Sequence, residues 1–124
     1  MRIYIASKYI EHKELNRELF QLIRQCGLDA FLPESINIDA ITLSEMQRVA
    51  EICYEEIRKS DIVLAVSPFG KSVSAELGFS IALQKKIIAY KKMEKDEAML
   101  SPYFDYIVST KEELSHLLLE LKQR

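Results

Sequence analysis

One uninterrupted apolar run near the middle of the chain, residues 62–66 (IVLAV), restricts the possible folds more than any other segment. Together with the preceding Asp61, the run predicts a strand over residues 61–66. A strand with no polar alternation is buried on both of its faces, which is typical of parallel sheets covered by helices on both sides. The rest of the chain must therefore supply helices for two faces of one sheet.

Strand-like and helical segments alternate along the chain. Short apolar runs predict the strands, and apolar residues three and four positions apart predict the helices. The predicted strands cover residues 2–6, 28–32, 61–66, 86–90 and 106–109, and the predicted helices cover residues 11–26, 42–59 and 73–85, with a last helix from residue 110 onward. Such alternation predicts an α/β fold with right-handed crossovers between parallel strands.

Five strands within 124 residues fit a flavodoxin-like three-layer sandwich with a parallel sheet in the order 2-1-3-4-5. This length is expected to form a single domain, residues 1–124. In this order, the loops after the first and third strands, residues 7–9 and 67–74, meet at the switch point of the sheet. Ligands of open α/β sheets bind at that point, so we expect a site there.

Local signals predict several helix ends. Thr42 and Glu45 form a capping box at the start of the second helix, and Thr110 and Glu113 have the same spacing at the last helix. Gly27 is a natural residue to end the first helix. The buried stripe of the second helix is expected to comprise Met46, Val49, Ala50, Cys53 and Ile57.

Composition excludes several classes of partner. A formal net charge of −2, without a basic run interleaved with aromatic residues, speaks against a nucleic-acid polymer. No segment approaches the roughly 20 apolar residues of a membrane span, so no membrane partner is expected. Cys26 and Cys53 fall at apolar helix positions and indicate reduced thiols in a cytoplasmic protein. His12 and His116 are isolated, which leaves no pattern for a metal site.

The loop after the central strand is the candidate active site, and Glu76 is its chemical centre. Small and polar residues gather there: Ser67, Pro68, Gly70, Lys71, Ser72 and Ser74. We expect Glu76 in the first turn of the following helix, where the helix dipole favours the ionised carboxylate. An ionised carboxylate suits a nucleophile or an electrostatic stabiliser better than a general acid. Plain helix stabilisation explains most such residues, but Val73 stands three residues before Glu76, so no Ser or Thr capping box explains this one.

Other uses of the fold lack their motifs. The sequence contains no G-x-G-x-x-G after the first strand, no P-loop and no G-x-S-x-G elbow. Three segments instead resemble the nucleoside 2-deoxyribosyltransferase family, which includes the 2′-deoxynucleoside 5′-phosphate N-hydrolases. They are M-R-I-Y-I-A at the start, E-x-I-x-x-S-D-I-V-L-A-V, and S-A-E-L-G-F-S-I-A-L-Q-K-K-I-I-A-Y. The resemblance covers most of the chain and is strongest over residues 60–90.

The resemblance implies a flavodoxin-like fold, homodimers or larger assemblies, no cofactor, and a Glu nucleophile in the segment matched here by A-E-L-G. By that match, Glu76 attacks the anomeric carbon of the sugar. Two positions depart from the family. Members of the family carry an Asp eight residues before the D-I-V run, and the residue at that position here is Cys53. An alignment shifted by two or three residues would instead match Glu55 or Glu56 to that Asp. Six residues before the Glu, transferases of the family carry Asp and the phosphate hydrolases often carry Ser, whereas this chain has Gly70. The absence of Asp at this position argues against simple transfer between free nucleosides.

Candidate substrate-binding residues surround this nucleophile. The Lys8 cation and the hydroxyls of Ser72 and Ser74 suit the binding of a 5′-phosphate. Ser72 is equally well explained as a helix N-cap. Ser101 resembles a Ser that reaches the phosphate from a neighbouring subunit. The full set of predicted substrate-binding residues is Tyr4, Ser7, Lys8, Gly70, Ser72, Ser74 and Ser101. Tyr4, Lys8 and Tyr9 are weak candidates for the proton donor, and the base of the substrate could instead be protonated already.

The leading hypothesis is an N-glycosidase that cleaves, or transfers across, the base–sugar bond of a nucleoside 5′-monophosphate or nucleoside. Two alternatives remain open at the level of sequence. Cys53 in place of a carboxylate is compatible with a catalytically silent nucleotide-binding module. A helix Glu in such a sheet is also compatible with a domain of the TIR kind that cleaves NAD or ADP-ribose.

Overall fold

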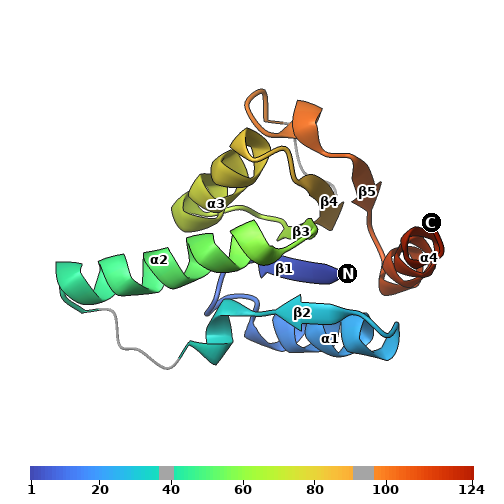
Figure 1. Cartoon of the computed structure of the whole chain (residues 1–124), viewed down its shortest axis with the longest axis horizontal. Coiled ribbons are helices and arrows are strands. Elements are labelled where there is room, and N and C mark those ends of the chain that lie inside the picture. The colour runs from blue at the N-terminus through green and yellow to red at the C-terminus, as the bar shows by residue number, and fades with distance from the viewer. Residues whose placement is uncertain (37–40, 91–96) are drawn as a thin grey trace.

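The computed structural model describes residues 1–36, 41–90 and 97–124 and contains a five-stranded parallel sheet in the order β2-β1-β3-β4-β5 (Figure 1). The strands are β1 (Arg2–Ala6), β2 (Asp29–Phe31), β3 (Ile62–Val66), β4 (Lys86–Tyr90) and β5 (Tyr106–Val108). The helices are α1 (Lys13–Gln25), α2 (Leu43–Lys59), α3 (Lys71–Ala82) and α4 (Lys111–Lys122), with 3-10 turns at Pro33–Ser35 and Ser101–Tyr103. The predicted fold class, strand order and alternation of elements are confirmed.

Helices cover both faces of the sheet, with α1 and α4 on one face and α2 and α3 on the other (Figure 1). Alternate residues of β3 therefore enter two cores: Leu64 packs in the core under α1 and α4, and Ala65 packs in the core under α2 and α3. All five residues of β3 are buried, as the apolar run predicted. The same alternation turns Tyr4 of β1 toward α2 and α3, the face that carries the candidate site.

Most of the predicted helix ends are confirmed. Thr42 and Glu45 form both hydrogen bonds of a capping box, and the Thr110 side chain accepts a hydrogen bond from the backbone of Glu113. Gly27, with φ of +80°, follows the end of α1 in the left-handed conformation that glycine adopts without strain.

The predicted start of α3 at residue 73 is wrong, because the helix begins at Lys71 with Gly70 as its N-cap. No side chain caps this end, so the sequence lacked the usual marker of a helix start. Ser72 consequently lies within the helix and does not act as the N-cap. Glu76 is the sixth residue of α3 and lies beyond its first turn.

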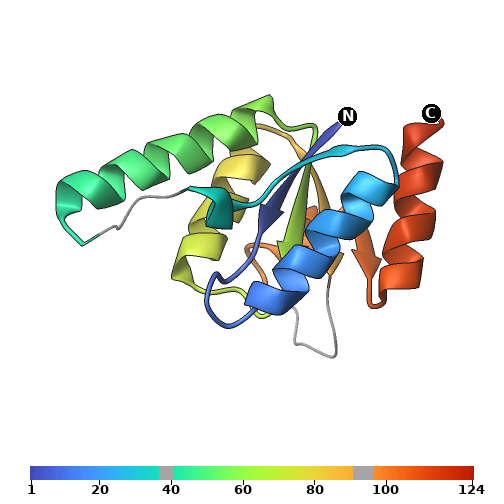
Figure 2. The same cartoon turned by 90° about the horizontal axis from the view of Figure 1, so that it is seen from below.

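The predicted buried stripe of α2 is also partly wrong. The buried residues of this helix are Cys53 and Ile57, whereas Met46 is 48% exposed. Figures 1 and 2 show the reason, because the N-terminal half of α2 extends past the edge of the sheet. Apolar residues on that half therefore lack a sheet to cover them. Within residues 1–36, 41–90 and 97–124, no helix is both long enough and apolar enough for a membrane span.

Candidate active site

The loops that follow β1 and β3 are in contact at the carboxyl end of the sheet. These two strands are neighbours, and their last paired residues are Ala6 and Ala65. The side chain of Lys8 crosses Gly70 so closely that a Cβ built on the glycine would lie 3.2 Å from Lys8 Cε. A larger residue at position 70 would displace this lysine. The meeting of the two loops agrees with the switch point expected from the strand order.

Tyr4 and Glu76 form the central contact of the site. The fully buried Tyr4 donates a hydrogen bond from its hydroxyl to the Glu76 carboxylate. Its ring is held by Phe31 of β2, which pairs with Tyr4 across the sheet and stacks on it at 5.7 Å between ring centroids. On α3, the Ser80 hydroxyl donates a 2.7 Å hydrogen bond to the Glu76 backbone carbonyl. Strand and helix thus both position this pair.

Burial raises the pKa of Glu76 to about 7, and the hydrogen bond from Tyr4 opposes that rise. The expectation that the helix dipole keeps Glu76 ionised is therefore wrong. The dipole acts within the first turn of a helix, and Glu76 lies past it, so loss of solvation decides the outcome. Near neutral pH the carboxylate is divided between its ionised form, which can attack a sugar carbon, and its protonated form.

Tyr4 is a hydrogen-bond donor here and a poor proton source. Burial raises the pKa of its phenol far above the usual value, and the negative charge of Glu76 adds to the effect. The hydroxyl stays protonated, and its hydrogen is directed at Glu76. Of the other proposed proton donors, Lys8 pairs with Glu11 at 3.2 Å, and Tyr9 is 50% exposed.

Cys53 of α2 is buried in the same core as Tyr4, as its place on the predicted buried stripe of the helix indicated. Its thiol lies on the sheet-facing side of α2, in the core that also contains Tyr4. Burial raises the pKa of this thiol, so it remains neutral. The only advance signal was its place on the helix stripe that faces β1.

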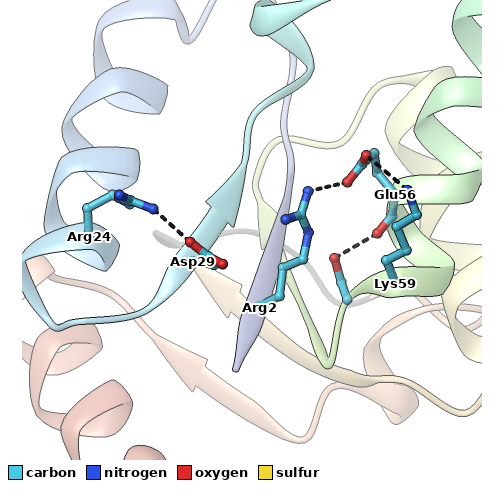
Figure 3. A network of polar contacts seen from close by, with 6 residues as sticks. Arg2, Arg24, Asp29, Glu56 and Lys59 are labelled. Atoms are coloured by element: carbon cyan, nitrogen blue, oxygen red, sulfur yellow. Dashed lines mark hydrogen bonds and ion pairs between the residues drawn. The ribbon is translucent and has the colours of Figure 1, made fainter.

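The suggested replacement of the missing carboxylate by Glu55 or Glu56 is not what the structure has. Glu56 pairs with Arg2 at the amino end of β1 and approaches Lys59 at 3.9 Å (Figure 3). Glu55 pairs with Arg58 at 3.3 Å on the surface of α2. Both carboxylates are therefore engaged away from the Tyr4–Glu76 pair.

The remaining predicted binding residues come from the loop after β1, the start of α3 and the 3-10 turn before β5. Ser7 Oγ lies 3.2 Å from His12 Nδ1. Ser72 is exposed, and Ser74 is half-buried, both near the start of α3. Ser101 accepts a 2.8 Å hydrogen bond from the Glu97 backbone within its own loop. Contact of any of these residues with a substrate stays a prediction. No group of His, Cys, Asp and Glu in the described part of the chain is arranged to hold a metal ion.

Replacement of Glu76 by glutamine is expected to stabilise the fold at about pH 8 and to have little effect at about pH 5. The pKa of Glu76 rises from its ordinary value of 4.5 to about 7 on folding. Between these values the folded protein binds more protons than the unfolded chain, so stability falls as pH rises. Glutamine removes that loss, which is about 3 kcal/mol at most and less where solvent reaches the carboxylate.

Thermal unfolding of both proteins at the two pH values measures this effect. Glu120→Gln, on the exposed side of α4, is the matched control and should change the midpoint equally little at both. A gain for Glu76→Gln that is the same at both pH values would contradict the raised pKa.

Comparisons with known proteins identify the family and the fold of the chain. A family model described as nucleoside 2-deoxyribosyltransferase matches residues 3–117. The 2-deoxyribosyltransferase of the psychrotolerant bacterium Bacillus psychrosaccharolyticus superimposes with a TM-score of 0.82 at 19% identity, over 93% of this chain and 90% of that one. A conserved protein from Enterococcus faecalis V583 gives 0.76 at 20% identity, over 98% of both chains.

A third solved structure, the Clostridium botulinum CMP N-glycosidase BcmB, gives a TM-score of 0.63 at 18% identity, over 95% of this chain and 98% of that one. At such identities these likenesses establish a shared fold. No curated protein sequence matches the chain significantly.

Proposed function

The chain belongs to the nucleoside 2-deoxyribosyltransferase family, and from this premise we propose that it cleaves the base–sugar bond of a nucleoside 5′-monophosphate or nucleoside through Glu76. The observation that carries the proposal is a half-buried carboxylate on the helix that follows β3, held by a hydrogen bond from the fully buried Tyr4. A partly desolvated carboxylate with one oxygen engaged and a pKa near 7 suits attack on an electrophilic carbon.

Cleavage proceeds in two steps. The ionised Glu76 attacks the anomeric carbon as the bond to the base breaks, which gives a glycosyl ester. Water then attacks the same carbon and releases the carboxylate, and the proton that the water loses balances the proton that a neutral base takes up as it leaves. Tyr4 acts as a positioning residue, because its hydroxyl fixes one carboxylate oxygen and leaves the other free for attack.

A 5′-phosphate would meet the contacting loops of β1 and β3. The start of α3 presents unpaired backbone N–H groups, which favour an anion, and Ser72 and Ser74 lie there. Lys8 crosses Gly70 into the same region. We propose hydrolysis as the main reaction, because Gly70 stands where transferases of the family carry Asp.

We also propose a homodimer or larger assembly. The apolar residues on the overhanging half of α2 and just before it are strongly exposed: Ile41 at 79%, Leu43 at 84% and Met46 at 48%. A second copy would cover them and bring Ser101 of the partner subunit toward the substrate. Sedimentation velocity is expected to show a dimer that Met46→Glu weakens, and a monomer at every concentration would contradict this proposal.

The direct test is a panel of nucleosides, 2′-deoxynucleosides and their 5′-monophosphates, with free base measured by chromatography. Release of base, fastest from monophosphates, is the expected result. Ligand-induced thermal stabilisation without any base release would instead support a silent binding module, for which Cys53 is the motivating residue. Base release from NAD but from no monophosphate would indicate the TIR-like alternative.

A further inference from the structure

The Glu76 carboxylate has no cationic partner among the residues that the structure describes. Its hydrogen-bond donor there is the neutral Tyr4 hydroxyl, and none of the ion pairs in residues 1–36, 41–90 and 97–124 includes it. Lys8 of the adjoining loop lies over Gly70 and forms its ion pair with Glu11 rather than with Glu76. Glu76 is half-buried, and a carboxylate that has lost part of its hydration is normally paired, because the lost solvation is costly. Within residues 1–36, 41–90 and 97–124, Glu76 therefore has no positive counter-charge, and a bound ligand could supply one.

The cluster around Glu76 also lacks an effective acid within the described residues. A neutral base must gain a proton as it leaves the sugar, and a positioned general acid typically accelerates such steps about 10²- to 10⁴-fold. The Tyr4 hydrogen is committed to Glu76, and the buried Cys53 thiol holds its proton too firmly. Glu76 itself must be ionised to attack.

From a carboxylate that has no cationic partner among the described residues, and from its neutral neighbours Tyr4 and Cys53, we infer that this site acts on nucleosides or nucleotides whose base carries a positive charge, such as an N-alkylated purine or an N-linked pyridinium. This inference rests on the proposed function and narrows its substrate class. The positive ring would lie against Glu76 and provide the counter-charge that the described residues do not.

The chemistry of such a substrate balances without an acid. An oxygen of Glu76 forms a bond to the anomeric carbon while the electron pair of the C–N bond moves onto the ring nitrogen. That pair cancels the positive charge, so the base departs as a neutral molecule and needs no proton. Water then attacks the anomeric carbon, the ester C–O pair returns to Glu76, and the proton of the water passes to solvent.

Matched nucleotide pairs test the inference with the unmodified protein. The first pair is 7-methylguanosine 5′-monophosphate and guanosine 5′-monophosphate, and nicotinamide mononucleotide is compared with cytidine 5′-monophosphate. The expected result is a kcat/KM at least about 100-fold higher for the cationic member of each pair, the size of an absent general acid. An enzyme that supplied its own acid would cleave both members at similar rates.

Variants at position 53 give a second readout. Cys53→Asp adds a carboxyl beside Tyr4 and Glu76 and is expected to narrow the cationic preference about tenfold or more. Cys53→Ser, which keeps a neutral side chain of similar size, should leave the preference unchanged. If Cys53→Asp does not fold, the ratio of kcat/KM values within each nucleotide pair, measured with the unmodified protein, still tests the inference.

The outcomes separate this inference from the proposed function. Preferred cleavage of the cationic nucleotide in both pairs supports both. Cleavage of guanosine or cytidine 5′-monophosphate as efficiently as the cationic members overturns the inference and leaves the proposed N-glycosidase intact. Release of base from none of the panel overturns both.

Discussion

Glu76→Gln is expected to lower the rate of base release by about 10⁴-fold or more, the scale of loss seen when a catalytic nucleophile is removed. Glutamine has nearly the same shape, and its carbonyl oxygen can still accept the hydrogen bond from Tyr4. It cannot form the glycosyl ester, because a neutral amide is a very poor nucleophile. The loss should therefore appear in kcat, with substrate binding largely retained.

Initial rates with the best substrate of the panel measure this effect. Glu120→Gln on α4 makes the same chemical change on an exposed helix surface and should retain full activity. If Glu76→Gln kept more than about a hundredth of the activity, Glu76 would not be the nucleophile.

Tyr4→Phe is expected to lower kcat/KM about 10- to 100-fold near pH 7, which is the typical contribution of a hydrogen bond to a charged group. The ring remains, so its stacking on Phe31 is preserved and only the hydroxyl is lost. Two effects combine, because the carboxylate loses its orienting contact and its pKa rises further without the donor.

The pH dependence distinguishes these effects from a structural defect. Only the ionised carboxylate attacks, so the kcat/KM of the unmodified protein should rise with pH and level off above about 7. In Tyr4→Phe the rise should move to higher pH, so its deficit is largest in acid and shrinks in base. Tyr54→Phe, on α2 outside the Tyr4–Glu76 pair, is the control. An unshifted profile for Tyr4→Phe would contradict the role of the hydrogen bond.

The architecture could be predicted because its signals are local. The apolar run of β3 indicated burial on both faces, and Thr42 with Glu45 marked a helix start through hydrogen bonds between near neighbours. The start of α3 was missed because Gly70 begins the helix without a capping side chain. Met46 was wrongly predicted to be buried, because its burial depends on where the sheet ends. The spacing of apolar residues along α2 does not show where that is.

The candidate site could be predicted only in part, for the same reason. Strand order brought the loops of Lys8 and Gly70 together, and the A-E-L-G segment singled out Glu76. The Tyr4–Glu76–Cys53 cluster depends on how α2 and α3 pack over β1, which no local pattern encodes. The pKa of Glu76 was misjudged because the dipole of a helix was weighed without the burial that tertiary packing imposes.

A trapped reaction intermediate tests the central claim, covalent catalysis by Glu76, most directly. The protein is mixed with a cleavable nucleotide that carries fluorine at C2′ of the sugar, which destabilises the oxocarbenium-like transition states and slows hydrolysis of the ester. Mass spectrometry of the quenched protein is expected to show one added fluorinated sugar phosphate, located on the peptide that contains Glu76 and absent in Glu76→Gln. Base release without any mass increase, or a label on another residue, would contradict the claim.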